Sequence, residues 1–462
     1  MYDIVIRNGA VIDGSGAASR NCDVAIESGR IAAVGKDLGP GAREVDASGL
    51  LVTPGWVDIH THYDGQVSWD PLLTPSSWNG VTTVVMGNCG VGFAPVLPGK
   101  EGYLIQLMEG VEDIPGAALS EGIEWNWETF PEYLDAIEKL PHAIDFGTQV
   151  PHGSVRTYVM GERGASNQKA TADDVAAMAA IVKEGLEAGA LGFSTTRTIL
   201  HRAGDGELAP GTTADREEVI GIGRAMGEVG HGVFEVASDL APEEEELDWM
   251  RQIGRETGIP VTFACLQNNG DPEQWRRLLA AVDEDRAAGG TLTPQVAQRP
   301  AGVLFSLESS GHPFLLHEAY QKVAALPMAE RVAALQDPAL RSEMLDNPPD
   351  LSGLPEVFTK SLSDWGNMFP LGDPIDYEPH PDQSILAQAA KLGCSPEALA
   401  YDTMLERNGK GIIYMPLLGY SYGDFESLRE MMEYPHAVFG LSDGGAHCGL
   451  ICDASMPTYL LT

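Results

Sequence analysis

Positive charge and long apolar runs are both scarce in this 462-residue sequence. Its 29 Lys and Arg residues stand against 67 Asp and Glu residues, which gives a formal net charge of −38. A polyanion repels nucleic acids and anionic membrane surfaces, so we exclude both as partners. No apolar run reaches the roughly 18 to 20 residues that a membrane-spanning helix needs. The opening residues, MYDIVIRNGAVIDG, also lack the layout of a signal peptide, so we expect a cytoplasmic protein.

Cysteine is the second scarce residue. The six cysteines are Cys22, Cys89, Cys265, Cys394, Cys448 and Cys452. A cytosolic protein of this size keeps its thiols reduced, so disulfides are not expected. Each Cys is therefore either core filler or a candidate for metal binding or catalysis. The apolar share of 44% and the charged share of 21% are those of an ordinary globular protein.

The first 52 residues predict a small antiparallel sheet. They consist of short alternating segments divided by turn signals at Asn8-Gly9, Asp13-Gly14 and Ser28-Gly29. A sheet this thin needs a larger body to pack against, which residues 53–462 would provide. The chain ends soon after Asp443, with room for about one or two helical turns. We therefore expect the last helix and any partner strands of the N-terminal sheet to lie outside these 462 residues.

From about residue 53, apolar strand candidates alternate with amphipathic helix candidates. The strand candidates are Val57–His62, Thr82–Asn88, Ile144–Val150, Ala190–Ser194, Gly232–Ala237, Pro260–Leu266, Thr291–Ala297 and Ala437–Ser442. The helix candidates between them are Ala172–Ala188, Glu217–Val229, Pro242–Thr257 and Pro272–Ala288. This alternation predicts an α/β fold with a parallel sheet, and eight strands predict closure into a TIM (β/α)8 barrel.

The connection before the last strand candidate is far longer than a loop. It runs from about 303 to 435 and contains helix candidates of its own at Gln321–Leu335 and Asp382–Leu392. Long connections with internal structure are commonly lids or binding segments. We interpret this one as an insertion on the substrate side of the barrel.

Polar residues stand at three of the predicted strand ends, where a TIM barrel carries its active site. His60 and His62 end the first strand, and residues two apart in a strand face the same way. Two histidines are common zinc ligands. Cys89 follows the second strand in a glycine-flanked turn, where it is either a ligand or buried filler. Asp443 follows the eighth strand, where a carboxylate can bind metal and accept a proton from water.

These residues carry a family resemblance. GLLVTPGWVDIHTHYD, WNGVTTVVMGNCGVG, VPHGSVR, GALGFSTTRT and FGLSDGGAH resemble the N-acyl-D-amino-acid deacylase (D-aminoacylase) branch of the amidohydrolase superfamily. The resemblance implies a TIM barrel, a small β-sandwich to which residues 1–52 contribute, and one or two Zn²⁺-type ions. It implies amide hydrolysis by a metal-activated water. It also implies metal and catalytic roles for His60, His62, Cys89 and Asp443.

The sequence departs from that family at two ligand positions. The family has a His at the ends of its fifth and sixth strands, whereas this chain has no His in the fifth and Cys265 in the sixth. Cys265 could replace an imidazole as a ligand. Glu235 on the fifth strand is either a further ligand or an internal salt-bridge partner. Gln267 stands where the family has a Lys that holds the substrate carboxylate. A single ion on His60, His62 and Asp443 remains an alternative to two ions.

Basic side chains are predicted to gather on the loops around this site. They are His152, Arg156, Arg197, His201, Arg202 and Arg299. Such a cluster in an acidic chain suggests an anionic substrate group, because Arg binds a carboxylate through two hydrogen bonds. His152 or an Arg would stabilise the oxyanion. The alternative for Arg197 and Arg202 is structural ion pairing with Asp205 or Glu207.

The favoured function is a metal-dependent hydrolase of an amide bond in a small, carboxylate-bearing substrate. Other bonds in the same fold, such as a lactone, an ester, a carbamate or a C–C bond, stay open as alternatives. A different class is a metal-poor binding or assembly protein that kept the fold. Converging polar groups such as His60, His62 and Asp443 are costly unless they bind something, which favours the enzyme. The partner is a small molecule, and a homo-oligomer is compatible with the sequence.

Overall fold

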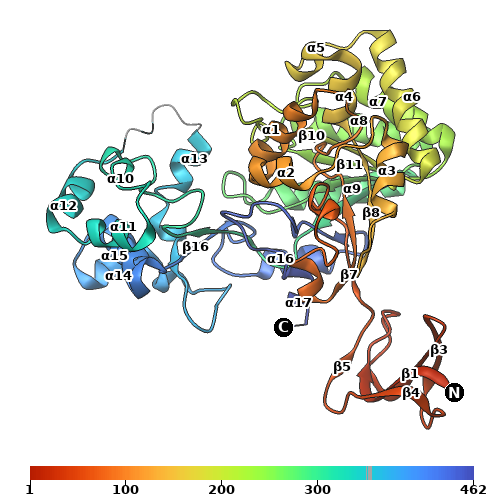
Figure 1. Ribbon diagram of the computed structural model, residues 1–462, viewed down its shortest axis with the longest axis horizontal. Helices are drawn as coiled ribbons and strands as arrows, with labels where there is room; N and C mark the ends of the chain where they lie inside the picture. Colours follow the sequence, from red (N-terminus) through yellow and green to blue (C-terminus); the bar gives the residue numbers. More distant parts are fainter. Residues whose placement is uncertain (350, 352–355, 462) are drawn as a thin grey trace. The chain divides into compact units, whose positions relative to one another are not determined.

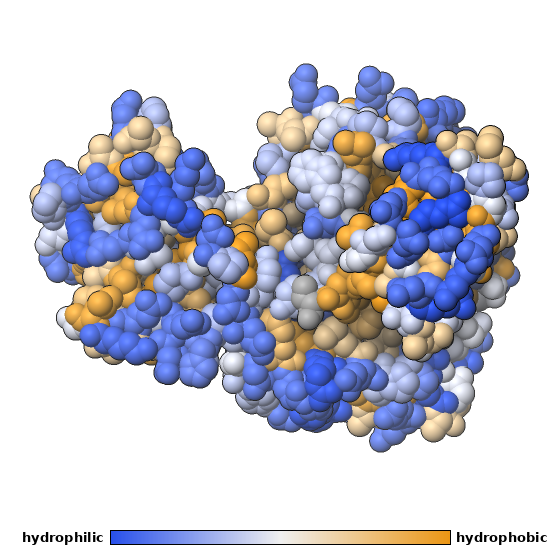
Figure 2. All heavy atoms as spheres, turned by 90° about the horizontal axis from the view of Figure 1, so that it is seen from below, coloured by the Kyte–Doolittle hydropathy of each residue, from blue (hydrophilic) through white to orange (hydrophobic). Residues whose placement is uncertain are grey.

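The computed structural model describes residues 1–349, 351 and 356–461, and it divides into two compact units, Met1–Trp56 and Val57–Thr462 (Figure 1). Every helix in the described part of the chain is too short or too polar to cross a membrane. Hydrophilic side chains, blue in Figure 2, cover much of the face shown there, as expected from the acidic composition.

The first unit is one five-stranded sheet. Its strands are β1 (Tyr2–Val11), β2 (Arg20–Glu27), β3 (Arg30–Gly35), β4 (Gly41–Asp46) and β5 (Leu51–Val52). The order is β3-β2-β1-β4, with β5 also paired to β1. The antiparallel prediction is correct for β1 to β3 and wrong for β4 and β5, which pair with β1 in parallel. The reason is that the chain crosses from β3 to the opposite edge of β1 instead of turning back in a hairpin.

The second unit is a mixed α/β structure built on parallel strands. The strands are β6 (Trp56–Asp58), β7 (Val81–Met86), β8 (Asp145–Thr148), β9 (Val150–Pro151), β10 (Gly192–Arg197), β11 (Val233–Ser238), β12 (Val261–Ala264), β13 (Leu292–Val296) and β17 (Val438–Phe439). They form the sheets β6-β7-β8 and β17-β13-β12-β11-β10-β9. Each strand candidate of the sequence overlaps one of them. A parallel bridge between Thr61 and Gly444 also joins the segments that follow β6 and β17.

Helices lie between these strands and gather around them (Figure 1). They are α1 (Glu101–Glu112), α2 (Gly116–Gly122), α3 (Phe130–Glu138), α4 (His152–Met160), α5 (Glu162–Ala165), α6 (Ala172–Ala188), α7 (Arg216–Val229), α8 (Glu243–Thr257) and α9 (Gln274–Ala287), with the short 3-10 helices η1 (Gln66–Ser68) and η2 (Ser76–Asn79). Their ends follow local chemistry. Thr171 and Asp174 form a capping box at the start of α6. Four Glu residues fill the first turn of α8, where the helix dipole favours negative charge.

The connection between β13 and β17 contains a small sheet and several helices. Its strands β14 (Ala301–Phe305), β16 (Ile413–Leu418) and β15 (Phe369–Pro370) pair antiparallel in that order. Its helices are α10 (Glu318–Gln321), α11 (Met328–Leu335), α12 (Pro338–Asp346), α13 (Glu356–Ser361), α14 (Ile385–Leu392), α15 (Pro396–Gly409), α16 (Glu426–Met432), η3 (Trp365–Asn367) and η4 (Pro381–Gln383), and α17 (Met456–Tyr459) follows β17.

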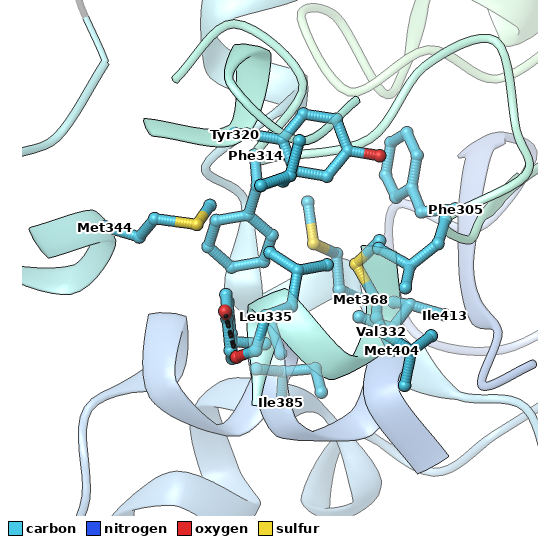
Figure 3. Packing of buried hydrophobic residues seen from close by; sticks show 14 of the residues in the cluster. Phe305, Phe314, Tyr320, Val332, Leu335, Met344, Met368, Ile385, Met404 and Ile413 are labelled. Carbon is cyan, nitrogen blue, oxygen red and sulfur yellow. Dashed lines mark hydrogen bonds between the residues drawn. The ribbon is translucent and has the colours of Figure 1, made fainter. Parts of the chain in front are cut away.

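This connection has an apolar core of its own. Figure 3 shows Phe314, Tyr320 and Leu335 turned toward a common interior, and all three are buried. The predicted helix at Gln321–Leu335 is wrong in its first half, because α10 ends at Gln321 and α11 begins only at Met328. Pro327 stands between them, and a proline disfavours helical backbone in the residue before it. The second helix candidate corresponds to η4 and α14.

Candidate metal centre

His60 and His62 lie side by side just beyond the end of β6. Backbone hydrogen bonds from Thr61 N to Val85 O and from His62 N to Gly444 O keep the chain extended past the strand. Residues two apart in an extended segment face the same way, so the two imidazoles point to one side. Their ring centroids are 5.5 Å apart. Both residues are buried, with exposed fractions of 2% and 1%.

Cys89 joins them from the turn after β7. The backbone of this turn is left-handed at Gly87, Cys89 and Gly90, with φ angles of 75°, 55° and 70°. Gly90 is required there, because a Cβ at this position would lie 2.9 Å from Thr196 N on β10. The Cys89 Sγ is 3.3 Å from His60 Nε2. One ligand atom from each of His60, His62 and Cys89 lies within 4.8 Å of the others.

Asp443 faces the same two imidazoles from the turn after β17. Its Oδ1 lies 3.5 Å from His60 Nε2 and 3.6 Å from His62 Nε2, and its side chain is 29% exposed. Burial would raise the pKa of Asp443, but His62, His60 and His447 together hold it below its usual value. The carboxyl is therefore ionised at neutral pH.

Glu235 on β11 and Gln295 on β13 lie behind His60. Gln295 Oε1 is 3.0 Å from His60 Nδ1, and Glu235 Oε1 is 4.0 Å from the same nitrogen. The other oxygen of Glu235 accepts a 3.1 Å hydrogen bond from Cys89 N. Burial raises the pKa of Glu235 to about 7, although His60 opposes this shift. The structure thus places Glu235 beside His60 and Cys89, where either of the roles that the sequence left open, a further ligand or an internal partner, remains a prediction.

Glu112 and His447 belong to the same cluster, and the sequence reasoning did not single them out. Glu112 ends α1, with Oε1 3.4 Å from His62 Nδ1 and Oε2 3.6 Å from His447 Nε2. His447 Nε2 is in turn 4.0 Å from Asp443 Oδ2. Glu112 stands in an amphipathic helix and resembles a solvated position. The available signal was its place in the last helical turn, where the dipole disfavours a carboxylate.

His201, one of the predicted loop residues, contacts the end of β10. His201 Nδ1 is 2.8 Å from Thr196 Oγ1. Burial, together with His447 and His62, lowers the pKa of His201 to about 3. His201 therefore lies within electrostatic range of His62 and is neutral at physiological pH.

His152 lies on the other face of the strands. Ser194 on β10 accepts a hydrogen bond from Gly90 N in the Cys89 turn, so the next residue, Thr195, faces the opposite way. His152 Nδ1 is 2.8 Å from Thr195 Oγ1, and its Nε2 is 2.9 Å from Glu218 Oε1 on α7. The structure therefore does not bring His152 to His60 and His62. Burial lowers the pKa of His152, so its contacts with Thr195 and Glu218 are structural hydrogen bonds of a neutral ring.

The remaining predicted residues are also engaged elsewhere. Arg156 pairs with Glu218, Arg197 with Glu246, and Arg299 with Asp453, while Arg202 Nη1 donates to Gly206 O. Gln267 donates to Ser427 Oγ and accepts from Ser421 N, so it holds the chain after β16. Cys265 is buried outside the three-residue ligand group, and burial raises the pKa of its thiol to about 12. The ion pairs differ from the predicted alternatives, Asp205 and Glu207.

The unpaired atoms of the cluster fit a bound cation. Both ring nitrogens of His62, Oε1 of Glu112 and Oε1 of Glu235 are buried without a hydrogen-bond partner. Within the described ranges, no Lys or Arg forms an ion pair with Asp64, Glu112, Glu235 or Asp443. Buried carboxylates are costly unless a positive charge compensates them. Imidazole, thiolate and carboxylate donors together suit a Zn²⁺-type ion.

Comparisons with known proteins show which family the chain belongs to. Residues 43–462 match the model of the amidohydrolase family. A D-aminoacylase of Alcaligenes xylosoxydans xylosoxydans is 33% identical over 277 residues, which cover 59% of this chain and 52% of that enzyme. The chain therefore spans about half the length of this relative. An uncharacterised protein of Mycobacterium tuberculosis is 27% identical over 470 aligned residues, covering 96% of this chain and 74% of that protein.

A solved structure shares the fold. It is an N-acyl-D-glutamate deacylase from Bordetella bronchiseptica in complex with zinc and a phosphonate inhibitor, a mimic of the tetrahedral intermediate. The TM-score is 0.58 at 23% sequence identity, over 95% of this chain and 75% of that one.

Proposed function

The chain belongs to the amidohydrolase family, and on that premise we propose that it is a metal-dependent hydrolase of an amide C–N bond. The observation that carries the proposal is the buried group of His60, His62 and Cys89 with Asp443 beside it. The substrate class is a small molecule with a carboxylate, of the N-acyl-D-amino-acid type. Its support is the D-aminoacylase relative and the donor set itself.

The proposed architecture is a TIM barrel closed between the ends of β6 and β17. The Thr61–Gly444 bridge supports this closure, because it links the two outermost strands of the parallel set. In this arrangement residues 53–462 form the barrel domain, with an insertion at about 303–435. Residues 1–52 form one part of a small β-sandwich. A cytoplasmic location remains our prediction.

The residues that would hold the ion are His60, His62, Cys89 and Asp443, with Glu235 behind them. A Zn²⁺-type ion bound there acts as a Lewis acid that polarises a carbonyl and lowers the pKa of water. Asp443 supplies the base, since its carboxylate is ionised at neutral pH and partly open to solvent. It accepts the proton of the attacking water and returns it to the leaving nitrogen. Among the residues predicted on the loops, we propose that His201 contacts the substrate.

The cysteines offer a matched test of the metal site. We expect native protein purified without added metal to contain one or two equivalents of a zinc-like metal. Cys89→Ala should lower this content because a ligand is lost. Cys265→Ala should leave it unchanged, because Cys265 lies outside the ligand group. Elemental analysis by mass spectrometry measures both, and hydrolysis of N-acyl-D-amino acids against their L-enantiomers measures the activity.

Each outcome of this test has one meaning. The proposed ligand set would be overturned if Cys265→Ala lost metal and Cys89→Ala kept the native metal content. A native protein without metal, and without deacylase activity after metal is added, would overturn the proposed function and favour a binding protein.

A further inference from the structure

Glu112 occupies a position that is unfavourable for a carboxylate. It is 2% exposed, and it ends α1, where the partial charge of the helix terminus is negative. Within the residues that the structure describes, its ion-pair partners are two histidines and no Lys or Arg. Burying a carboxylate in such surroundings costs free energy that the fold does not recover locally. We therefore expect Glu112 to make a contact that the function requires.

The backbone fixes Glu112 between two loops of the metal centre. Its carbonyl oxygen accepts a hydrogen bond from His447 N. The neighbouring Asp113 has a left-handed φ of 50°, and its Oδ2 accepts from Ser310 Oγ at 2.8 Å and from Gly449 N at 3.3 Å. The end of α1 is therefore docked on the segment that carries Asp443 and His447. This docking aims the Glu112 carboxylate at His62.

The two proposed metal histidines have parallel surroundings. His60 turns Nε2 toward Cys89 and Asp443, and its Nδ1 faces Gln295 Oε1 at 3.0 Å. His62 turns Nε2 toward Asp443, and its Nδ1 faces Glu112 Oε1 at 3.4 Å, near enough to pair although the two atoms are not aligned as a hydrogen bond. A metal-binding imidazole usually donates its other N–H to such an acceptor, which fixes its tautomer and orientation.

We propose that Glu112 is the positioning residue of His62, accepting its Nδ1–H so that Nε2 presents its lone pair to the metal. This rests on the proposed metal-dependent function. The second carboxylate oxygen holds His447 beside Asp443, 3.6 Å from His447 Nε2. A cation bound beside it favours the ionised form of Glu112, and the carboxylate then makes His62 a stronger ligand than the neutral amide of Gln295 makes His60, because its charge stabilises the positive charge that ligation shifts onto the ring. Glu112 thus sets metal affinity without touching the metal or the substrate.

The test compares three variants in two measurements. Glu112→Leu removes the acceptor, Glu112→Gln keeps an acceptor oxygen without the charge, and Glu109→Gln on the exposed side of the same helix is the control. Chelator competition with Zn²⁺ gives the metal dissociation constant. Two-bond 1H–15N spectra of histidine-labelled, metal-free protein give the tautomer of His62, assigned with a His62→Gln sample.

The expected result follows from the role of an outer hydrogen-bond partner. Glu112→Leu should weaken Zn²⁺ binding about 10- to 100-fold, the usual loss when such a partner is removed. Glu112→Gln should lose less, and Glu109→Gln should match the native protein. The Nδ1–H tautomer of His62 should dominate in native protein and Glu112→Gln, and should be lost in Glu112→Leu. If Glu112→Leu does not fold, the tautomer of native protein and the affinity of Glu112→Gln still decide.

Three outcomes would overturn the proposal. Unchanged affinity in both Glu112 variants would make the contact incidental. An Nε2–H tautomer in native metal-free protein would contradict the orientation. A fall in the number of bound ions, rather than in affinity, would make Glu112 a direct ligand. If the native protein binds no Zn²⁺, the proposed function fails, whereas the tautomer measurement still tests the contact between Glu112 and His62.

Discussion

Two buried histidine clusters lie on opposite faces of the parallel strands, and they differ in how their charges are balanced. The salt-bridge cluster consists of His152, Arg156 and Glu218; the metal cluster consists of His60, His62, Cys89, Glu112, Glu235 and Asp443. Burial would raise the pKa of Glu218, but His152 and Arg156 hold it below its usual value. In the metal cluster, burial and neighbouring carboxylates raise the pKa of Glu112 well above its usual value.

The difference separates structure from function among residues of the same types. Glu218 Oε1 accepts hydrogen bonds from Arg156 Nε at 2.8 Å and from His152 Nε2 at 2.9 Å. Its cost of burial is compensated within the chain. In the metal cluster, Nε2 of His62 is buried without a hydrogen-bond partner, while its Nδ1 faces Glu112 Oε1 at 3.4 Å. A cluster with such unpaired atoms requires a ligand from outside the chain, and a divalent cation is the ligand that fits.

Substituting Asp443 in the metal cluster and His152 in the salt-bridge cluster should give the largest difference in catalytic activity. Asp443→Asn should lower kcat/KM for an N-acyl amino acid by about a hundred- to ten-thousandfold, the usual contribution of a general base. His152→Gln removes the other residue that the sequence suggested as catalytic. It should leave kcat near the native value in the folded fraction, because His152 faces Thr195 and Glu218 instead of the metal cluster. Steady-state kinetics on purified, metal-loaded protein measures both variants.

The opposite pattern would break the comparison. A large loss of kcat in His152→Gln with unchanged circular dichroism and metal content would return His152 to the active site. Nearly native activity in Asp443→Asn would remove the proposed base.

The second contrast is in stability. Glu218→Gln leaves Arg156 buried with a weaker partner, and breaking one side of a buried ion pair costs about 3 to 5 kcal/mol. We expect that loss in the free energy of unfolding, measured with urea, and unchanged metal per folded molecule. Glu217→Gln, at the exposed neighbouring position of α7, should stay within about 0.5 kcal/mol of the native protein. Loss of metal in Glu218→Gln at unchanged stability would contradict the structural role.

The fold was predictable where local pattern decides it. Strand and helix candidates were found because apolar periodicity and turn signals are local in sequence. The pairing of β4 with the far edge of β1 was not predictable, since register across a sheet depends on the path of the chain. The interruption at Pro327 was signalled by the proline itself, and the sequence reasoning missed it.

The metal cluster was predictable where a residue stands at a strand end. His60, His62, Cys89 and Asp443 were found in this way. Glu112 was not, because a helix in a loop region brings it to the strand ends only through tertiary contacts, here through Asp113. His152 shows the reverse case. It follows a strand end directly, but the turn into α4 carries it to the helix-facing side of the strands.

Substitution of Arg197 should have the smallest of the expected effects on stability. It tests whether this side chain is structural, like the salt-bridge cluster, or functional, like the metal cluster. Its Nε lies 2.7 Å from Glu246 Oε2, its Nη1 donates to Ala214 O at 2.8 Å, and its guanidinium stacks on Trp249 at 5.5 Å. A Lys at this position keeps an ion pair with Glu246, but it lacks the several N–H donors of the guanidinium and its stacking on Trp249. Arg197→Lys should therefore cost about 1 kcal/mol of unfolding free energy.

The control for Arg197 is Arg202→Lys in the loop after β10. Among the described residues, the side chain of Arg202 hydrogen-bonds through Nη1 to the backbone carbonyl of Gly206. This variant should shift stability by less than about 0.5 kcal/mol. Neither variant should change KM, because the contacts of both side chains lie among residues of the protein itself. A KM that rises at least tenfold in Arg197→Lys at native stability would instead show that the guanidinium leaves Glu246 to bind the substrate carboxylate. The ion pair between Arg197 and Glu246 would then be the substrate-free state of a substrate-binding residue. Arg197 would have to be counted with the active site.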